Sequence, residues 1–515
     1  MIKIAPETWK ADLPAFKEKT EAFYNGELEK NSYKGFSGLY GSYAQKGGQA
    51  SMLRLRMTGG RINMDKLKFI ADSIEKYNVN KVHFTTCQTV QLHNLDQTAV
   101  CEIMEAALDH GIVTMGGGGD FPRNVMVSPL SGVENGEYFY VWPYAKAAGG
   151  YLMTFIKAEK MPRKLKVGFS NSPENVTHAT FRDLGFVARP DGCFDVYSAG
   201  GLGNNPRFGL KVAEKVDPSK ILYYICAMRD TFMTYGNYEK RNKARTRYMQ
   251  ETLGEEGYVK AYLEKLDQVM QSGQDLDIHV EAEPVTKKGC GEAPANQRVR
   301  PQKQEGLYTV VYHPIGGCPA PSKFGEIYQA VKDMEEVELR LAPDETMYIV
   351  NLTAAEVPAV LEATKDSAAT LFESSVSCIG ASICQVGVRD SQGLLIKIVE
   401  AAREAGFEDG ILPKVHISGC PSSCGTHQIG DIGFHGGVKM IDKVAQPAFT
   451  LHFNGCDLQG SERMGQQIGV ILEKDIPAFI VELGRTVTQS GMKFAQWKEE
   501  NQETLVKIAG KYMIS

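Results

Sequence analysis

Alternating apolar and polar positions predict short strands next to segments with helical spacing. The first such series reads strand, helix, strand over residues 52–57, 65–77 and 82–93, and a weaker version of it runs over residues 307–350. Residues 391–407 carry apolar side chains at helical spacing, and residues 414–417 then alternate as a strand. The pattern therefore predicts a chain of mixed α and β units.

Part of the sequence occurs twice at a constant offset of 248 residues. Each copy follows a short alternating run, which covers residues 164–169 in the first copy and 414–417 in the second. A constant offset without a gap favours internal duplication over two unrelated α/β domains. The five identities are Ser170, Pro173, Asp183, Gly185 and Phe186, which recur as Ser418, Pro421, Asp431, Gly433 and Phe434.

Composition excludes several classes of protein. The chain has 515 residues, 43% of them hydrophobic, so it is neither disordered nor fibrous. Its net charge of −5 is unlike that of a general nucleic-acid binder. The 11 cysteines are an odd number, and the N-terminus lacks the apolar region of a signal peptide. We therefore expect reduced thiols, a cytoplasmic location and no membrane span.

Four cysteines fall within 47 residues and form two pairs. Five residues separate Cys378 from Cys384, and three separate Cys420 from Cys424. The second pair is expected on a loop that leaves a strand. Ser172 and Val176 stand at the corresponding positions of the first copy, so only the second copy can hold a thiolate centre there. Buried thiols without a ligand, a structural zinc site and an iron–sulfur cluster all remain open, and the five-residue gap favours the cluster.

Three runs place polar or charged residues at every second position, so on a strand these side chains share one face. By pattern alone this is the solvent face of an antiparallel strand. The Gly-rich run 199–205, with Gly200, Gly201 and Asn204, is either a backbone cradle for a cofactor or a turn. The three alternating runs contain Arg54 and Arg56; Lys164 and Lys166; and Thr89, Gln91 and His93.

The motif Cys-x5-Cys followed by Cys-Pro-Ser-Ser-Cys resembles the sirohaem and [4Fe–4S] signature of the nitrite and sulfite reductase haemoprotein family. The resemblance extends over nearly the whole chain. It implies an α+β fold, a tandem pseudo-twofold repeat of a ferredoxin-like half-domain plus a sirohaem/[4Fe–4S]-type α/β domain. The expected parts are an extension (1–40), a first ferredoxin-like half (41–112), a first reductase domain without a cluster (113–280), a linker (281–304), a second ferredoxin-like half (305–368) and a second reductase domain with the cluster (369–515).

The resemblance also implies roles for individual residues. The segments MLRLRMTGG, FPRNV, MPRKLK and QTVQLH each resemble family segments that line the sirohaem. By that resemblance Cys424 ligates both the cluster and the sirohaem iron. Cys87 departs from the family, which commonly has Arg there, and is either an inert buried thiol or a reactive group. The implied catalytic cations are Arg56, Arg123, Lys164 and Lys166; the implied cofactor contacts are Gln91 and His93; and the implied cluster ligands are Cys378, Cys384, Cys420 and Cys424.

The expected activity is the six-electron reduction of sulfite to sulfide. The reduction of nitrite to ammonia is the alternative within the family, and a non-catalytic iron–sulfur electron carrier is the alternative outside it. Lys166 favours sulfite, because nitrite-specific relatives tend to have Asn there. The sequence contains neither a Cys-x2-Cys-x2-Cys run nor a dinucleotide-binding Gly motif after a strand. Electrons are therefore expected from a separate ferredoxin or flavoprotein subunit.

Overall fold

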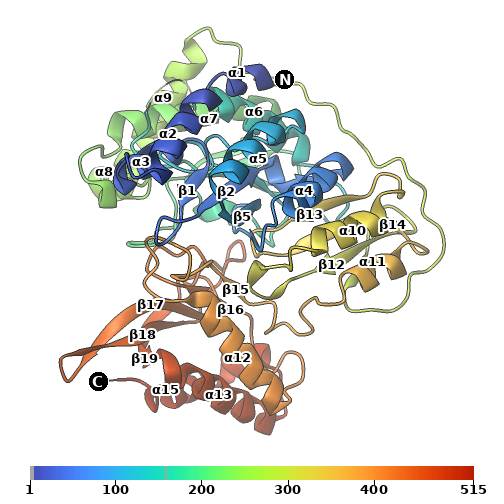
Figure 1. Cartoon of the computed structure of the whole chain (residues 1–515), viewed down its shortest axis with the longest axis vertical. Helices are drawn as coiled ribbons and strands as arrows, with labels where there is room; N and C mark the ends of the chain where they lie inside the picture. Colours follow the sequence, from blue (N-terminus) through green and yellow to red (C-terminus); the bar gives the residue numbers. More distant parts are fainter. Residues whose placement is uncertain (1–4, 157, 159, 515) are drawn as a thin grey trace. The chain divides into compact units, whose positions relative to one another are not determined.

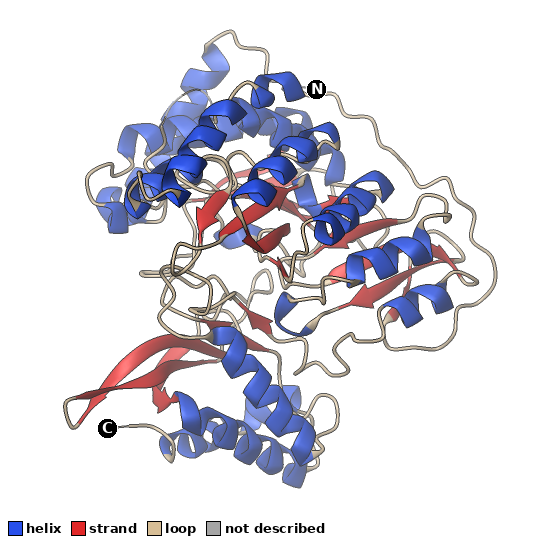
Figure 2. Cartoon of the chain, viewed as in Figure 1, coloured by secondary structure: helices blue, strands red, loops and turns tan. Residues whose placement is uncertain are grey.

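Four β-sheets with their helices make up residues 5–156, 158 and 160–514, the part that the computed structural model describes (Figures 1 and 2). The chain divides into two units. The first comprises residues 1–201, 205–312 and 319–365, and the second comprises residues 202–204, 313–318 and 366–515. No helix among the described residues is long and apolar enough to cross a membrane.

Two ferredoxin-like halves lie in the first unit and share one hydrophobic core. β3 lies within the first half in sequence but pairs with β13 of the second, with Leu339 opposite Ile62. All strand pairs of both sheets are antiparallel. The first sheet has the order β1 (Ser42–Ala44), β2 (Ser51–Arg56), β5 (Thr89–Leu95), β4 (Lys81–Phe84), and the second has β11 (Val299–Pro301), β12 (Leu307–Tyr312), β14 (Met347–Thr353), β13 (Glu338–Leu341), β3 (Arg61–Ile62).

The other two sheets have the same topology, one in each unit. In each, three strands are parallel and two further strands continue antiparallel. One sheet contains β6 (Met126–Val127), β7 (Val167–Ser170), β8 (Leu184–Ala188), β9 (Phe194–Ser198) and β10 (Leu210–Val216), and the other contains β15 (Val376–Ser377), β16 (Val415–Ser418), β17 (Ile432–Ile441), β18 (Val444–Phe453) and β19 (Gln466–Leu472).

The repeated topology agrees with the predicted duplication, down to the register. Val167 pairs with Leu184 in the first copy, and Val415 pairs with Ile432 in the second, 248 residues later in both strands. The unusual backbone also repeats. Asn175 and His178 have positive φ angles of 49° and 58°, and the residues 248 positions later, Ser423 and Thr426, both have a φ of 54°.

Close packing explains why both copies keep a glycine at the start of the third strand. A Cβ atom on Gly185 would lie 1.8 Å from the carbonyl oxygen of Ala179, and one on Gly433 would lie 1.8 Å from that of His427. Neither position has room for a side chain. The glycine lets the loop before the strand pack directly on the sheet.

Helices cover the sheets, and several begin at a capping residue. Asn63, Asp96 and Asp390 each accept a hydrogen bond from a backbone N–H of the first turn of α4, α5 and α12. The helices are α1 (Pro6–Lys10), α2 (Leu13–Tyr24), α3 (Lys30–Ser37), α4 (Met64–Lys76), α5 (Gln97–Asp109), α6 (Trp142–Thr154), α7 (Ile221–Tyr235), α8 (Tyr248–Leu253), α9 (Glu255–Gln271), α10 (Lys323–Val331), α11 (Val357–Ala363), α12 (Ser391–Ala405), α13 (Ile476–Ser490), α14 (Phe494–Glu500) and α15 (Gln502–Gly510).

Two of the predicted strands need correction. The predicted strand 82–93 is two strands, β4 and β5, because residues 85–88 form a tight turn in which the Gln88 N–H donates to the Thr85 carbonyl at 2.9 Å. The predicted strand 164–169 begins only at Val167, where β7 starts. Residues before it form one parallel bridge, between Leu165 and Pro122.

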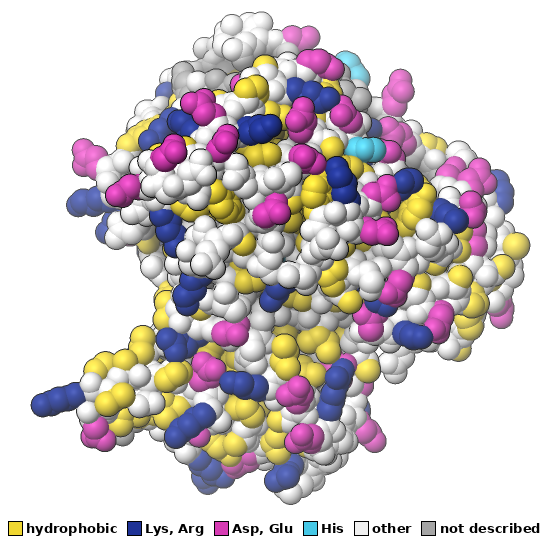
Figure 3. Space-filling view, viewed as in Figure 1, with side chains coloured by type: hydrophobic (Ala, Val, Ile, Leu, Met, Phe, Trp, Pro, Cys, Tyr) yellow, Lys and Arg dark blue, Asp and Glu magenta, His cyan; other side chains and the backbone are white. Residues whose placement is uncertain are grey.

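The surface shows no concentration of one charge on the face displayed in Figure 3, where Lys and Arg side chains alternate with Asp and Glu.

Candidate functional site

The four cysteines lie in the second unit, on the two loops that follow β15 and β16. Cys378 directly follows β15, and Cys384 lies on the same loop. Cys420 and Cys424 lie on the loop that leaves β16, as predicted. Cys424 is exposed, whereas the other three are partly buried.

Backbone N–H groups surround two of these thiols. The Gly419 N–H donates to Cys378 Sγ at 3.2 Å, and the backbone of Gly387 donates to Cys384. Burial, and then the nearby Cys424, raise the pKa of Cys378 to about 12, while the hydrogen bonds act in the opposite direction. The Cys378 thiolate would therefore not be stable here without a compensating cation. Amide donors to sulfur are typical of iron–sulfur sites, where they stabilise the charged ligands.

The first copy shows what this scaffold looks like without a metal centre. Ser128 occupies the place of Cys378, and its Oγ accepts from the Asn171 N–H at 3.1 Å as Cys378 Sγ accepts from Gly419. Ser172 and Val176 correspond to Cys420 and Cys424, so the first copy has no cysteine at these three positions.

The four sulfurs are near neighbours, but they are not as close as the ligands of a single ion. Cys384 interacts electrostatically with both Cys420 and Cys424. Within residues 5–156, 158 and 160–514, the one group of metal-ligating side chains whose atoms all lie within 4.8 Å consists of histidines and not of these cysteines. The spacing fits a larger inorganic core better than one zinc ion.

A polar sheet face in the first unit carries the predicted cofactor contacts. Arg54 is opposite Gln91 and Arg56 is opposite Thr89. Gln91, with its amide oxygen turned toward Arg54, accepts from Arg54 Nη2 at 2.6 Å. His93 is 1% exposed, and its Nε2 is buried without a hydrogen-bond partner among the described residues. This face is therefore not a solvent face, which corrects the interpretation from pattern alone.

Two of the predicted cations hold a glycine-rich loop. Nη1 of Arg56 donates to the carbonyls of Met115 and Pro122 at 3.2 and 3.1 Å, and its Nη2 donates to that of Arg123 at 2.8 Å. Arg123 in turn donates to the carbonyls of Gly117 and Gly119, both at 2.8 Å. Burial, and then the charge of Arg123, lower the pKa of Arg56. Residues 116–119 were not among the predicted site residues, although four consecutive glycines are a visible signal in the sequence.

Lys166, one of the predicted catalytic cations, contacts Cys87, the residue at which the chain departs from the family pattern. The Lys166 side chain hydrogen-bonds the Cys87 thiol. Burial alone would raise the pKa of this thiol, but the charges of Lys166 and Arg182 outweigh burial and lower it to about 6. Burial is also the main cause that lowers the pKa of Lys166. Lys164 is half-buried and lies two residues earlier on the same extended segment.

Two further arginines, Arg182 and Arg245, lie near Lys166 and Cys87 and were not predicted from the sequence. Arg182 is 6% exposed and donates to the Thr177 carbonyl at 2.8 Å. Arg245 pairs with the buried carboxylate of Asp183 at 3.0 Å, and this carboxylate also accepts from the Lys166 backbone N–H at 2.8 Å. Asp183 belongs to the repeated block and Arg182 precedes it directly, but no local pattern marked Arg182 as part of a cationic site.

The Gly-rich run 199–205 contains a turn. Gly201 and Arg207 form an antiparallel bridge, and a Cβ on Gly200 would lie 2.6 Å from the Phe181 Cα, so packing accounts for that glycine. A Cβ on Gly201 would have Arg247 Nη1 3.5 Å away. Asn204 belongs to the second unit, where its neighbour Gly203 exchanges two hydrogen bonds with the Gln428 amide, at 2.8 and 2.9 Å.

The cationic cluster, which we define as Arg54, Arg56, Arg123, Lys166 and Arg182, fits an anionic group. Within the described part of the chain, Arg56, Arg123 and Lys166 form no ion pair with a carboxylate. Arg123 Nε is buried without a hydrogen-bond partner there. Uncompensated buried cations are unfavourable, and a bound polycarboxylate or oxyanion would relieve that cost.

Comparison with known proteins gives matches over most of the chain. Residues 43–110 match the nitrite/sulfite reductase ferredoxin-like half domain, and residues 118–270 match the nitrite and sulphite reductase 4Fe–4S domain. The second match supports an iron–sulfur cluster in this protein. This match covers the first copy, which lacks the paired cysteines. It therefore does not show which residues hold the cluster.

The relatives that are similar to the chain at low identity include proteins named as nitrite reductases and a protein named as a sulfite reductase. A chloroplastic ferredoxin–nitrite reductase of Betula pendula is 26% identical over 75% of this chain and 67% of its own length. A sulfite reductase [ferredoxin] 2 of Mycolicibacterium paratuberculosis is 24% identical over 87% of this chain and 81% of its own. The solved structure of Mycobacterium tuberculosis NirA has a TM-score of 0.78, with 22% identity, over 95% of this chain and 94% of that chain.

Proposed function

The chain belongs to the nitrite and sulfite reductase family, and from this premise we propose that it reduces sulfite to sulfide with six electrons, using a sirohaem and a [4Fe–4S] cluster. The observation that carries the proposal is the cationic cluster, in which Arg56 is buried, Arg123 and Lys166 are partly buried, and none of these three is paired with a carboxylate of the described chain. An electron carrier without an anionic substrate would have no use for such a group.

The cluster is assigned to Cys378, Cys384, Cys420 and Cys424, with Cys424 shared with the sirohaem iron. Cys424 suits this role because it is the exposed member of the four. When bound, the two groups would supply the electrons through the shared thiolate. Amide donors such as the Gly419 N–H would hold the cysteine sulfurs in their charged form.

The cations divide the remaining work. Arg56 and Arg123 are fixed by backbone carbonyls, so their unused N–H donors keep a constant direction toward an oxyanion. Lys166 moves the proton: burial lowers the pKa of its ammonium, which therefore gives up a proton more readily than an exposed lysine does. Lys164 is the second proposed donor. Gln91, His93, Gly200, Gly201 and Asn204 are proposed as cofactor contacts.

Nitrite is the alternative substrate. Relatives named as nitrite reductases and as sulfite reductase are similar to the chain at nearly the same identity, 26% and 24%. Lys166 is the residue that favours sulfite, because nitrite-specific members of the family tend to have Asn at this position. We propose a separate ferredoxin as electron donor, as the names of both relatives indicate for those proteins.

Replacing one lysine tests the substrate assignment. With Lys166→Asn, we expect sulfite turnover to fall about 100-fold through loss of a general acid. Nitrite turnover should fall much less, so the nitrite-to-sulfite ratio should rise. Equal losses with both anions would contradict the choice of sulfite. Lys160→Asn, an exposed residue of the same segment, is the matched control.

A further inference from the structure

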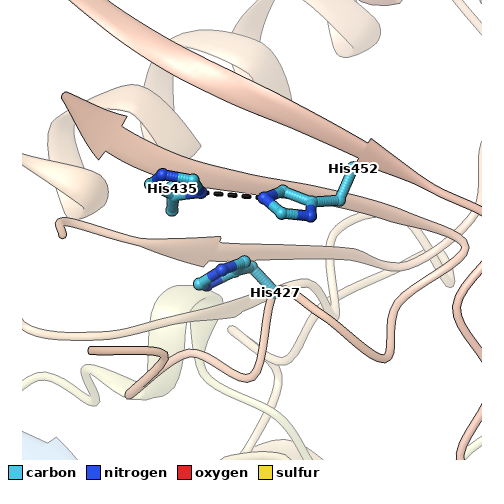
Figure 4. Close-up of side chains that lie close together, drawn as sticks. All are labelled: His427, His435 and His452. Carbon is cyan, nitrogen blue, oxygen red and sulfur yellow. Dashed lines mark hydrogen bonds between the residues drawn. The ribbon is translucent and has the colours of Figure 1, made fainter. Parts of the chain in front are cut away.

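Three histidines of the second unit come together on one side of the β15–β19 sheet (Figure 4). His435 lies on β17, His452 lies on β18, and His427 lies on the loop that carries Cys424. One ring nitrogen of each histidine lies within 4.8 Å of the other two. His435 Nδ1 and His452 Nε2 are 2.8 Å apart, and the His427 ring lies 4.9 and 4.8 Å from their two rings.

Strand register and one glycine bring the three rings together. His435 pairs with Thr450 and His452 pairs with Gly433, so the two histidines are diagonal neighbours on one sheet face. The loop before β17 packs directly on Gly433, because that residue has no side chain. This close approach places His427 beside the other two.

The cluster contains ring nitrogens that the protein leaves unsatisfied. His427 is 1% exposed and His452 is 7% exposed. Nδ1 of each is buried without a hydrogen-bond partner of ordinary geometry among the described residues, although the Gly465 backbone interacts with the His452 ring. A buried polar atom without a partner is unfavourable, and a bound ion would relieve that cost. Burial also lowers the pKa of all three rings, so each is neutral near pH 7 and offers a lone pair.

The first copy shows that the fold does not need histidine at these places. By the same offset and register, Ala179 corresponds to His427, Val187 to His435 and Tyr197 to His452. The first copy forms the same sheet with these residues. Like the paired cysteines, the three histidines occur in the second copy alone.

We propose that His427, His435 and His452 bind a divalent transition-metal ion, for which Zn²⁺ is the probe. Three imidazoles with a water molecule form an established kind of zinc site, and imidazole suits zinc among other first-row metals. Zinc–nitrogen bonds of about 2.0–2.1 Å require ring nitrogens roughly 3.3 Å apart. His435 Nδ1 and His452 Nε2, which are 2.8 Å apart, must therefore separate by about 0.5 Å, and His427 must move closer to them by up to about 1.5 Å. The ion would fasten the Cys424 loop to β17 and β18. This inference does not rest on the proposed reductase activity.

Zinc absorption spectroscopy of the cluster-containing protein tests the site directly. The protein is equilibrated with Zn²⁺, freed of unbound metal, and studied by elemental analysis and at the zinc K-edge, where iron does not interfere. We expect one equivalent of zinc with nitrogen neighbours at about 2.0–2.1 Å. No retained zinc, or sulfur neighbours at about 2.3 Å, would overturn the proposal, since sulfur would place the ion on cysteines.

Variants built from the first copy provide the second readout. His435→Val and His427→Ala introduce residues that the first copy already accommodates at these places, and each should lose the bound zinc. His279→Ala removes an exposed histidine elsewhere and should keep it. Circular dichroism checks that each variant is folded. Full zinc retention in folded His435→Val would contradict the proposal, whatever the outcome for the second variant.

Discussion

The most unusual residue of the molecule is Cys87, a thiol placed among buried cations. Lys166 hydrogen-bonds it, and Arg182 and Arg54 contribute further positive charge. Of the two interpretations that the sequence left open, an inert buried thiol and a reactive group, the contacts favour the second. A thiolate at this position would also neutralise part of the cationic cluster, where the family commonly has another cation.

We expect Cys87 to be alkylated at unusually low pH. Its pKa of about 6 means that the reactive thiolate forms as the pH rises through that value, about three units below an ordinary cysteine. The rate of carboxamidomethylation of Cys87, followed by peptide mass spectrometry, should be half-maximal near pH 6. Lys166→Asn should move this midpoint upward, because it removes the nearest positive charge.

Cys101 is the internal control for this experiment. Burial raises the pKa of that thiol to about 11, so its alkylation should increase only in strongly alkaline solution. A midpoint for Cys87 at or above that of an ordinary cysteine, about pH 8.5, would show that the cations do not control the thiol.

For individual residues, the sequence predicted which side chains share a face of a strand, but it did not predict what covers that face. The alternation of Arg54 and Arg56 is typical of a solvent-exposed strand, yet Arg56 is 6% exposed because residues 115–123 cover it. Coverage by a distant loop has no local signal. Arg182 and Arg245 were missed for the same reason, since their positions depend on Asp183 and on tertiary packing.

Among the elements, the loop between the second and third parallel strands determines the chemistry of each copy. In the second copy this loop carries Cys420, Cys424 and His427, and it packs on β17 through Gly433. The sequence predicted the strand and the loop correctly, because β16 alternates and small residues follow it. It did not predict that residues 82–93 contain a turn, because residues 85–88 include no Gly, Pro, Asn or Asp, which are the residues that usually mark a turn.

A methyl group on Gly433 should destabilise the second unit. The added Cβ of Gly433→Ala would lie 1.8 Å from the His427 carbonyl oxygen, so the loop must move away from the sheet. Overpacking of this kind costs about 1–3 kcal/mol. We expect a lower melting temperature by calorimetry and a smaller iron content than in the unchanged protein.

Gly437→Ala is the matched control, since Gly437 lies on the same strand with no atom within 4 Å of the added Cβ. It should melt at nearly the same temperature as the unchanged protein. Equal effects of the two substitutions would show that the strand needs glycine for reasons other than the packing of the loop.

For the whole molecule, the central feature is a duplicated fold whose two copies differ in chemistry. The constant offset of 248 residues revealed this duplication in the sequence, because insertions between the repeated residues are absent. The two cysteine pairs could also be recognised in the sequence, because the members of each pair lie only a few residues apart. The net charge of −5 was uninformative, because it averages a buried cationic cluster with a mixed surface.

Replacing Cys424 of the second copy by the corresponding residue of the first copy should remove the activity without disrupting the fold. Cys424→Val introduces the residue that stands at the matching position of the first copy, Val176, so the scaffold should persist. We expect loss of activity together with loss of the sirohaem and cluster absorption bands, and an almost unchanged far-ultraviolet circular dichroism spectrum. A variant that kept both absorption bands would disprove the shared-thiolate assignment.

The measurement that tests the central claim most directly is the steady-state oxidation of reduced methyl viologen by the cofactor-containing protein, with sulfide and ammonia quantified as products. We predict that sulfite accelerates viologen oxidation and that one sulfide appears for every six electrons consumed. If neither sulfite nor nitrite accelerates the oxidation in protein that shows both the sirohaem and the cluster absorption bands, the assignment of this chain as an oxyanion reductase is contradicted.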